Sequence, residues 1–217
     1  MSDAQLVSVL LTAPPAQRRE PISVGGNTRY QDTRLKALAL FASRGFSAVS
    51  MRDLARHLGI RPGSIYNHIE SKEALLFELI EELYELLLHG ARQVARRAAT
   101  PADQLHGLLE AHLRLHDSMS KQFRLAEYDS HCLAGEQQAR IGELRGRYEQ
   151  LLMDSVEQFG GQPLGSRRRA ALGSIVSLLN QLPAWLDTPG LSPQARLDLL
   201  HEMVMSTLRA ALRAPLD

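Results

Sequence analysis

The residues of this sequence that are best suited to chemistry lie close together in residues 50–68, which read SMRDLARHLGIRPGSIYNH. Ser50 and Asp53 have the spacing of a capping box, so a short helix is predicted to begin here and to end before Gly59. Pro62 suits the first turn of a second short helix, predicted to reach about His68. Two short helices joined by a glycine-containing turn form the pattern of a helix-turn-helix, whose second helix enters the major groove of DNA.

The second short helix carries small or hydrogen-bonding side chains beyond those needed for packing. Leu54, Ile60 and Ile65 would be buried, which leaves an outward set rich in hydrogen-bond formers: Arg61, Gly63, Ser64, Tyr66, Asn67 and His68. A generic helical hairpin in a bundle is the alternative, but a core helix would not expose so many polar groups in eight residues. Arginine pairs well with guanine and asparagine with adenine. We therefore expect the polar groups of this set to be candidates for reading base edges.

The distribution of charge also divides the chain. Eight basic and three acidic residues lie between Arg29 and Lys72, so this segment carries +5. The whole chain carries only +1, which leaves −4 on the remainder. A basic segment on a mildly acidic body indicates one part that faces a polyanion and another with a different task, although chance clustering of solvated charges is the alternative.

The elements that must position these groups are all predicted to be helices. A first helix is expected over 28–44, and Ser71 caps a much longer fourth helix with a leucine stripe. Further helices are expected at about 101–117, 119–131, 137–159, 166–187 and 193–213. No stretch alternates with period two for long enough to propose a sheet. The sequence thus predicts an all-α protein with a mobile tail over 1–27, a three-helix helix-turn-helix domain over 28–72, and a helical domain over 73–217.

Several classes of protein are excluded by what the sequence lacks. It has no GxSxG, P-loop, GxGxxG or HExxH motif and only one cysteine, so we expect no enzyme, no cofactor and no disulfide framework. His112 and His116 are four residues apart, which makes a metal site conceivable, but ordinary histidines are favoured. No apolar run is long enough to cross a membrane and the first residues make a poor signal peptide, so we expect a cytoplasmic protein.

The stretch GFxxxSMRDLAxxLGIxxGSIYxHIxSKEALL, within residues 42–76, resembles the DNA-binding domain of TetR-family transcriptional repressors. The resemblance covers about 45 residues, and its glycine turn, Tyr66, His68 and Lys72 are specific in their spacing. It implies a homodimer that binds a palindromic double-stranded DNA operator, with a C-terminal body that dimerises and binds a small effector. The effector would release the protein from its operator. A constitutive DNA-architectural protein, the alternative, would not need so large a body.

The resemblance also assigns roles to individual residues. It implies phosphate contacts at the start of the second helix and around the mouth of the groove, made by Ser50, Arg52, Tyr66, His68 and Lys72. It leaves base contacts to Arg61, Ser64 and Asn67, with Gly63 allowing close approach.

The effector is expected to bind among aromatic and polar groups in the second half of the chain. The candidate ligand-binding residues are Phe123, Arg124, Tyr128, Arg145, Tyr148, Asn180 and Trp185. Arg124 or Arg145 would hold an anionic or polar head, although each of these residues could equally be part of the core. Residues 127–148 and 174–192 resemble a TetR branch whose effectors include acyl-CoA thioesters from lipid or steroid breakdown. We therefore expect a small, mostly apolar effector such as an acyl-CoA or a lipid-derived acid. A repressor of an efflux or stress system that responds to an unrelated hydrophobic compound is the alternative.

The last two predicted helices carry apolar stripes that could join two copies of the chain. Leu172, Ile175, Val176 and Leu179 mark the first stripe, and Leu197, Leu200, Val204 and Leu208 mark the second. Two long apolar helices at the end of the chain suit a four-helix interface with two-fold symmetry.

Overall fold

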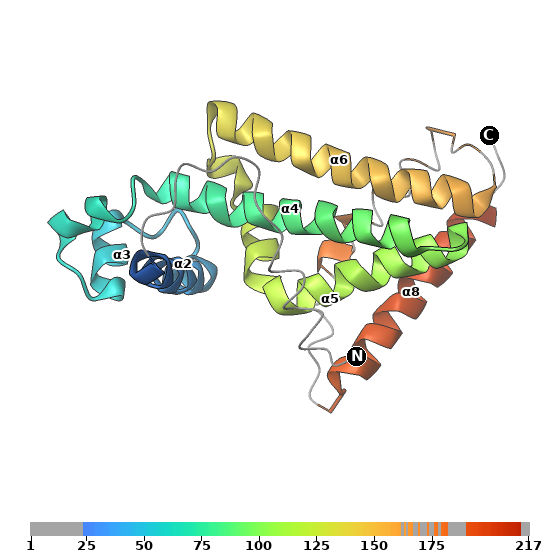
Figure 1. Ribbon diagram of the computed structural model, residues 1–217, viewed down its shortest axis with the longest axis horizontal. Coiled ribbons are helices and arrows are strands. Elements are labelled where there is room, and N and C mark those ends of the chain that lie inside the picture. The colour runs from blue at the N-terminus through green and yellow to red at the C-terminus, as the bar shows by residue number, and fades with distance from the viewer. Residues whose placement is uncertain are drawn as a thin grey trace.

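The computed structural model describes residues 24–213, apart from 162, 164, 167–168, 170–172, 174–175, 178 and 182–189. Every regular element in this part is a helix, which confirms the all-α prediction. The helices are α2 (Val24–Arg44), α3 (Met51–Leu58), η1 (Pro62–Asn67), α4 (Lys72–Arg97), α5 (Pro101–Tyr128), η2 (Ser130–Cys132), α6 (Gly135–Gly160) and α8 (Pro193–Arg213). Helices α4, α5 and α6 run along the long axis, with α2 and α3 at one end (Figure 1).

The helix-turn-helix forms as the local sequence signals predict. Ser50 and Asp53 make the capping box of α3, in which Asp53 N donates to Ser50 Oγ at 3.2 Å and Ser50 N to Asp53 Oδ2 at 3.1 Å. Gly59 ends the helix with φ +71°, a left-handed conformation that glycine adopts without strain. The following helix, η1, is a 3₁₀ helix that ends at Asn67, one residue earlier than predicted.

The first helix begins at Val24 and not at Thr28, so the boundary predicted for the tail was four residues too late. The pair Gly25-Gly26 suggested a break, but glycine only lowers helix propensity by about 1 kcal/mol and does not forbid a helix. Residues 1–23, the rest of the predicted tail, lie outside the described residues.

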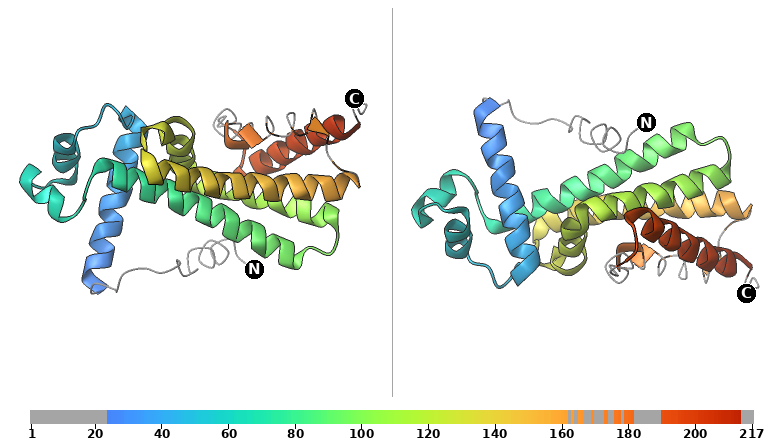
Figure 2. Two further views of the ribbon diagram at one scale, coloured as in Figure 1. Left: turned by 90° about the horizontal axis from the view of Figure 1, so that it is seen from above. Right: turned by 90° about the horizontal axis from the view of Figure 1, so that it is seen from below.

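The body is built on α4 and the helices packed against it. The helices predicted at 101–117 and 119–131 are one helix, α5, with a kink at Met119, where φ is −126° and ψ is 31°. Gly107 lets α5 approach α4 closely, since a Cβ there would lie 2.8 Å from Val94 Cγ1. The two views of Figure 2 show α2 crossing one end of this bundle and α8 lying near the other. The predicted helix at 166–187 is only partly described, and its described residues from 176 to 181 are helical.

One apolar core runs through both parts of the protein. It extends from Phe41 and Phe46, which precede α3, through the buried face of α4 to Leu144 and Tyr148 of α6. A second cluster joins α5, α6 and α8 through Leu109, Val156, Val204 and their neighbours. Helix α4 contributes to the core beneath the helix-turn-helix and to the core of the body. A displacement of this helix would therefore change the packing in both parts of the protein.

Candidate functional site: a DNA-reading surface and a cavity in the body

The outward face of η1 is exposed and polar, as predicted. Ile65 is fully buried and anchors the helix, whereas Tyr66 is 62% exposed. Arg61, Gly63, Asn67 and His68 are exposed and Ser64 is half-buried. A Cβ at Gly63 would meet no atom within 4 Å, so the fold does not require glycine there.

Two of the predicted phosphate ligands also have structural partners within the domain. The Ser50 hydroxyl is engaged with Asp53, and its hydrogen bonds hold the pKa of that carboxyl below the ordinary value. Lys72 Nζ donates to the carbonyls of Phe46 and Val49 at 3.3 and 3.2 Å and lies 4.3 Å from the centre of the Phe46 ring. Lys72 therefore braces the segment between α2 and α3. Arg52 is exposed.

Helix α4 is tied to α2, the first helix of the helix-turn-helix part, by ion pairs. Arg34, which is nearly buried, contacts Glu82 with its terminal nitrogen and lies 3.7 Å from Glu78 through Nε. The Tyr30 hydroxyl donates to Glu78 at 2.7 Å. These contacts give α4 a polar connection to the helix-turn-helix in addition to the apolar core.

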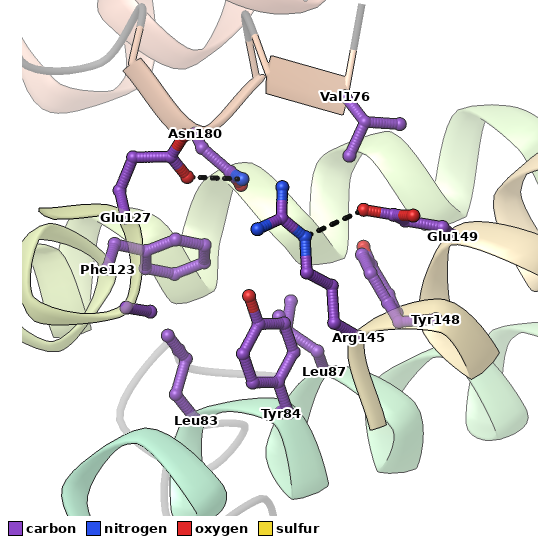
Figure 3. Close-up of a pocket in the computed structure, with 11 residues that line it drawn as sticks. Leu83, Tyr84, Leu87, Phe123, Glu127, Arg145, Tyr148, Glu149, Val176 and Asn180 are labelled. Carbon is purple, nitrogen blue, oxygen red and sulfur yellow. Dashed lines mark hydrogen bonds and ion pairs between the residues drawn. The ribbon is translucent and has the colours of Figure 1, made fainter. Parts of the chain in front are cut away.

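A cavity lies in the body where α4, α5 and α6 meet residues 176–180 (Figure 3). The space is small and partly open to solvent, and its wall is part aromatic, part aliphatic and part charged. It is lined by Leu83, Tyr84, Leu87, Phe123, Ala126, Glu127, Arg145, Tyr148, Glu149, Val176 and Asn180.

Four of the predicted ligand-binding residues meet in this cavity: Phe123, Arg145, Tyr148 and Asn180. Arg124 and Tyr128 do not line it and are exposed, and Trp185 lies outside the described residues. Sequence reasoning missed Tyr84, Glu127 and Glu149. Tyr84 interrupts the leucine stripe of α4, and an aromatic hydroxyl in that stripe was the available signal.

The polar groups of the cavity are largely paired with one another. Arg145 Nε donates to Glu149 at 2.9 Å, which raises the pKa of the guanidinium, and Asn180 Nδ2 donates to Glu127 at 3.4 Å. Burial raises the pKa of Tyr84 to about 12, so its hydroxyl keeps the proton and can donate. The cavity can therefore offer both apolar surface and hydrogen-bond donors to a ligand.

Two buried histidines of α5 support the wall of the cavity. His112 Nδ1 lies 2.9 Å from the Tyr148 hydroxyl, and His116 Nε2 lies 2.9 Å from the backbone oxygen of Asn180. Burial lowers the pKa of His112 to about 3 and also lowers the pKa of His116, so both rings are neutral at pH 7. Among the described residues, no group of three His, Cys, Asp or Glu side chains could hold a metal ion.

A second hollow adjoins this cavity and is almost wholly apolar. It is also small, and it is lined by Leu105, Leu109, Leu152, Met153, Val156, Val176, Leu179 and Leu208. Val176 lines both spaces. The polar cavity and the apolar hollow are therefore neighbours.

Within the described part of the chain, no helix combines the length and hydropathy needed to traverse a bilayer.

Comparison with known proteins identifies the family. The family model "Bacterial regulatory proteins, tetR family" matches residues 35–79, and "Tetracyclin repressor-like, C-terminal domain" matches residues 98–208. The transcriptional repressor KstR2 of Mycobacterium tuberculosis is 31% identical over 124 residues, which are 57% of this chain and 61% of KstR2. The match thus spans less than two thirds of that relative. The transcriptional activator FasR of Mycolicibacterium smegmatis is 23% identical over 185 residues, 81% of this chain and 84% of FasR.

Solved structures share the fold at low sequence identity. The ketosteroid transcriptional regulator KstR2 of Mycobacterium tuberculosis superposes with a TM-score of 0.70 at 22% identity, covering 85% of this chain and 95% of that one. AibR in complex with isovaleryl coenzyme A and operator DNA gives 0.68 at 21% identity, covering 81% and 97%. Since the C-terminal family model alone spans more than half of the chain and the N-terminal model covers the helix-turn-helix, the protein belongs to the TetR family of DNA-binding transcriptional regulators, which are not enzymes.

Proposed function

We propose that the protein is a dimeric regulator, acting as a repressor, that binds a palindromic operator and is released when a small, mostly apolar ligand enters the cavity of the body. The observation that carries this proposal is the double role of α4. Its residues Leu83, Tyr84 and Leu87 line the cavity, and the carboxylates of Glu78 and Glu82, just before them on the same helix, hold Arg34 of the DNA-binding domain. A ligand that displaces α4 would move the helix-turn-helix with it, in the cytoplasm where the operator lies.

The ligand we propose has an elongated apolar body and a polar head, such as an acyl-CoA or a related lipid-derived compound. The apolar hollow next to the cavity suits the body of such a ligand, and the donors of Tyr84, Arg145 and Asn180 suit its polar head. Arg124 is exposed one residue after Phe123, where it is available to a phosphate of coenzyme A outside the cavity. The names of KstR2 and of the AibR complex support a ligand of this kind, because they refer to ketosteroids and to isovaleryl coenzyme A.

The dimer we propose uses the last helix. Leu199 and Met203 lie one turn apart on α8 and are 38% and 41% exposed, although large apolar side chains are normally covered. Leu200, Val204 and Leu208 on the same helix are buried in the body's own core. A second copy of α8 would cover the exposed face, as in the four-helix interface expected from the sequence.

Fluorescence anisotropy with labelled DNA from upstream of the protein's own gene tests this function. We expect saturable, sequence-selective binding that is reversed by titrating acyl-CoAs from isovaleryl-CoA to longer chains. A Tyr66→Ala variant is the control, and we expect it to bind the same DNA weakly. Binding that no acyl-CoA reverses would reject the thioester ligand and favour an unrelated hydrophobic compound. An absence of selective binding would reject the regulator itself.

A further inference from the structure

We propose that Glu127 makes the cavity select ligands that place an uncharged oxygen, such as a thioester or ester carbonyl, at its polar end, and that it rejects a free carboxylate there. This inference rests on the proposed function, in which the cavity is the effector site. Glu127 would decide which ligand head group the cavity accepts.

The charges that line the cavity do not balance. Arg145 supplies one positive charge, whereas Glu127 and Glu149 supply two negative charges. Arg145 and Glu149 neutralise each other, with 2.9 Å between Nε and Oε1. The partner of Glu127 is the neutral amide of Asn180, at 3.4 Å, so the negative charge of Glu127 is the excess. Figure 3 shows Glu127 on one side of the cavity, Glu149 on the other, and the guanidinium of Arg145 between them.

The buried groups next to the cavity do not restore the balance. His112 and His116 flank Phe123, with ring centres 5.2 and 4.5 Å from the Phe123 ring, and both are buried. A neutral imidazole adds no positive charge. The described lining therefore carries a net charge of −1 at neutral pH.

A ligand carboxylate in this space would lie near Glu127 and compete with Glu149 for Arg145. Like charges at short range in a partly buried site disfavour the charged form of one of them. A neutral carbonyl avoids this repulsion and still accepts hydrogen bonds from Tyr84, Asn180 and the free N–H groups of Arg145. The arrangement therefore favours the esterified form of an acyl chain over the free acid.

The apolar hollow indicates where the chain of a selected ligand would lie. Val176 lines both spaces, so a ligand with its carbonyl beside Asn180 can extend its chain past Val176 toward Leu179 and Leu208. The head-group choice would then act on ligands that share the same apolar body.

A displacement assay with two matched ligands tests the role of Glu127. The uncharged fluorophore N-phenyl-1-naphthylamine would report occupancy of the cavity in the full-length protein, and methyl octanoate and octanoate would compete with it. The two competitors share the same chain and differ in the charge of the head. In the wild-type protein we expect the ester to displace the fluorophore at a concentration at least tenfold lower than the acid.

The variant Glu127→Gln keeps the size and hydrogen-bonding capacity of the side chain and removes its charge. We expect octanoate to compete at least fivefold better in Glu127→Gln than in the wild-type protein, so that the preference for the ester becomes smaller. Glu143→Gln is the matched control, because Glu143 is exposed on α6 and pairs with Arg140 and Arg147 away from the cavity. Circular dichroism and thermal melting establish that each variant is folded.

Three results would overturn the inference: an equal affinity of the wild-type protein for acid and ester, an unchanged difference in Glu127→Gln, or no binding of the fluorophore. The proposed function fails separately, through the operator. If ligands occupy the cavity without altering DNA binding, the regulatory proposal is wrong while the preference for the ester stands.

Discussion

The hydroxyl of Tyr148 on α6 lies 2.9 Å from Nδ1 of His112 on α5, and both side chains are almost completely buried. Their rings are stacked, with centres 5.8 Å apart. Tyr148 lines the cavity of the body and also a separate hollow between α4 and α5, which His112 lines as well. The pair is therefore a buried polar contact that borders both spaces.

We expect Tyr148→Phe to destabilise the protein by about 1–3 kcal/mol, because it leaves a buried imidazole nitrogen of His112 without its partner. The other nitrogen, Nε2, is buried and forms no well-formed hydrogen bond within the described part of the chain. Urea unfolding measures the change. Tyr128→Phe is the control, since the Tyr128 side chain is 61% exposed, and its stability should match the wild type. Equal stabilities of Tyr148→Phe and the wild type would contradict the buried contact described here.

The stability of the protein should fall as the solution is acidified below about pH 6.5. Burial lowers the pKa of His112 to about 3, so between these values the unfolded chain binds a proton that the folded chain excludes. The contribution of His112 is thus complete above the unfolded pKa and decreases by about 1.4 kcal/mol for each unit of falling pH. Denaturant unfolding from pH 7 to pH 4.5 gives the slope. We expect His112→Phe to have a shallower slope, and an unchanged slope would show that His112 is protonated in the folded protein.

The parts of the fold set by local sequence were predicted well. The capping box of Ser50 and Asp53 and the turn at Gly59 depend on residues within one turn of each other, so the sequence contains the whole signal. The kink at Met119 depends on how α5 packs against its neighbours, and its neighbouring residues carry no proline to announce it. The predicted break between residues 117 and 119 lies beside this kink, where the helix bends but does not end.

The sequence predicted only some of the residues that line the cavity, and helix geometry explains part of this outcome. Phe123 and Glu127 are four residues apart and share a face of α5, which points into the cavity. Arg124 and Tyr128 are one and five residues from Phe123, which rotates them about 100° and 140° away from it around the helix. Tyr84 and Glu149 were missed because their position depends on which faces of α4 and α6 meet α5, and that is a property of tertiary packing.

Substitutions of Tyr66 and Asn67, on the exposed face of η1, should change DNA binding in different ways. Tyr66→Ala is expected to weaken binding to all DNA sequences and to reduce the dependence of the binding constant on salt, because we propose that Tyr66 contacts a phosphate. Asn67→Ala is expected to relax base preference by about 1–3 kcal/mol. Anisotropy titrations at several salt concentrations, with operator and scrambled DNA, separate the two. If Tyr66→Ala leaves affinity and salt dependence unchanged, the proposed docking of η1 is wrong.

The exposed face of α8 should determine the oligomeric state. One chain has a mass of 24.1 kDa, and we expect light scattering at micromolar concentration to give twice this value. Met203→Glu places a charge on that face and should shift the protein toward the monomer. Leu35→Glu on α2 is the matched control, since Leu35 is 62% exposed, and it should remain dimeric. A monomeric wild-type protein would contradict the proposed interface.

We propose that occupancy of the cavity and binding of the operator are coupled through α4. Both sides of that coupling can be measured with the acyl-CoA that releases the operator most strongly. We expect saturating ligand to weaken operator binding by a factor in the range of about 5 to 150, and saturating operator DNA to weaken ligand binding by the same factor. Anisotropy gives the first factor and isothermal titration calorimetry the second. An operator affinity that is the same with and without bound ligand would contradict the account.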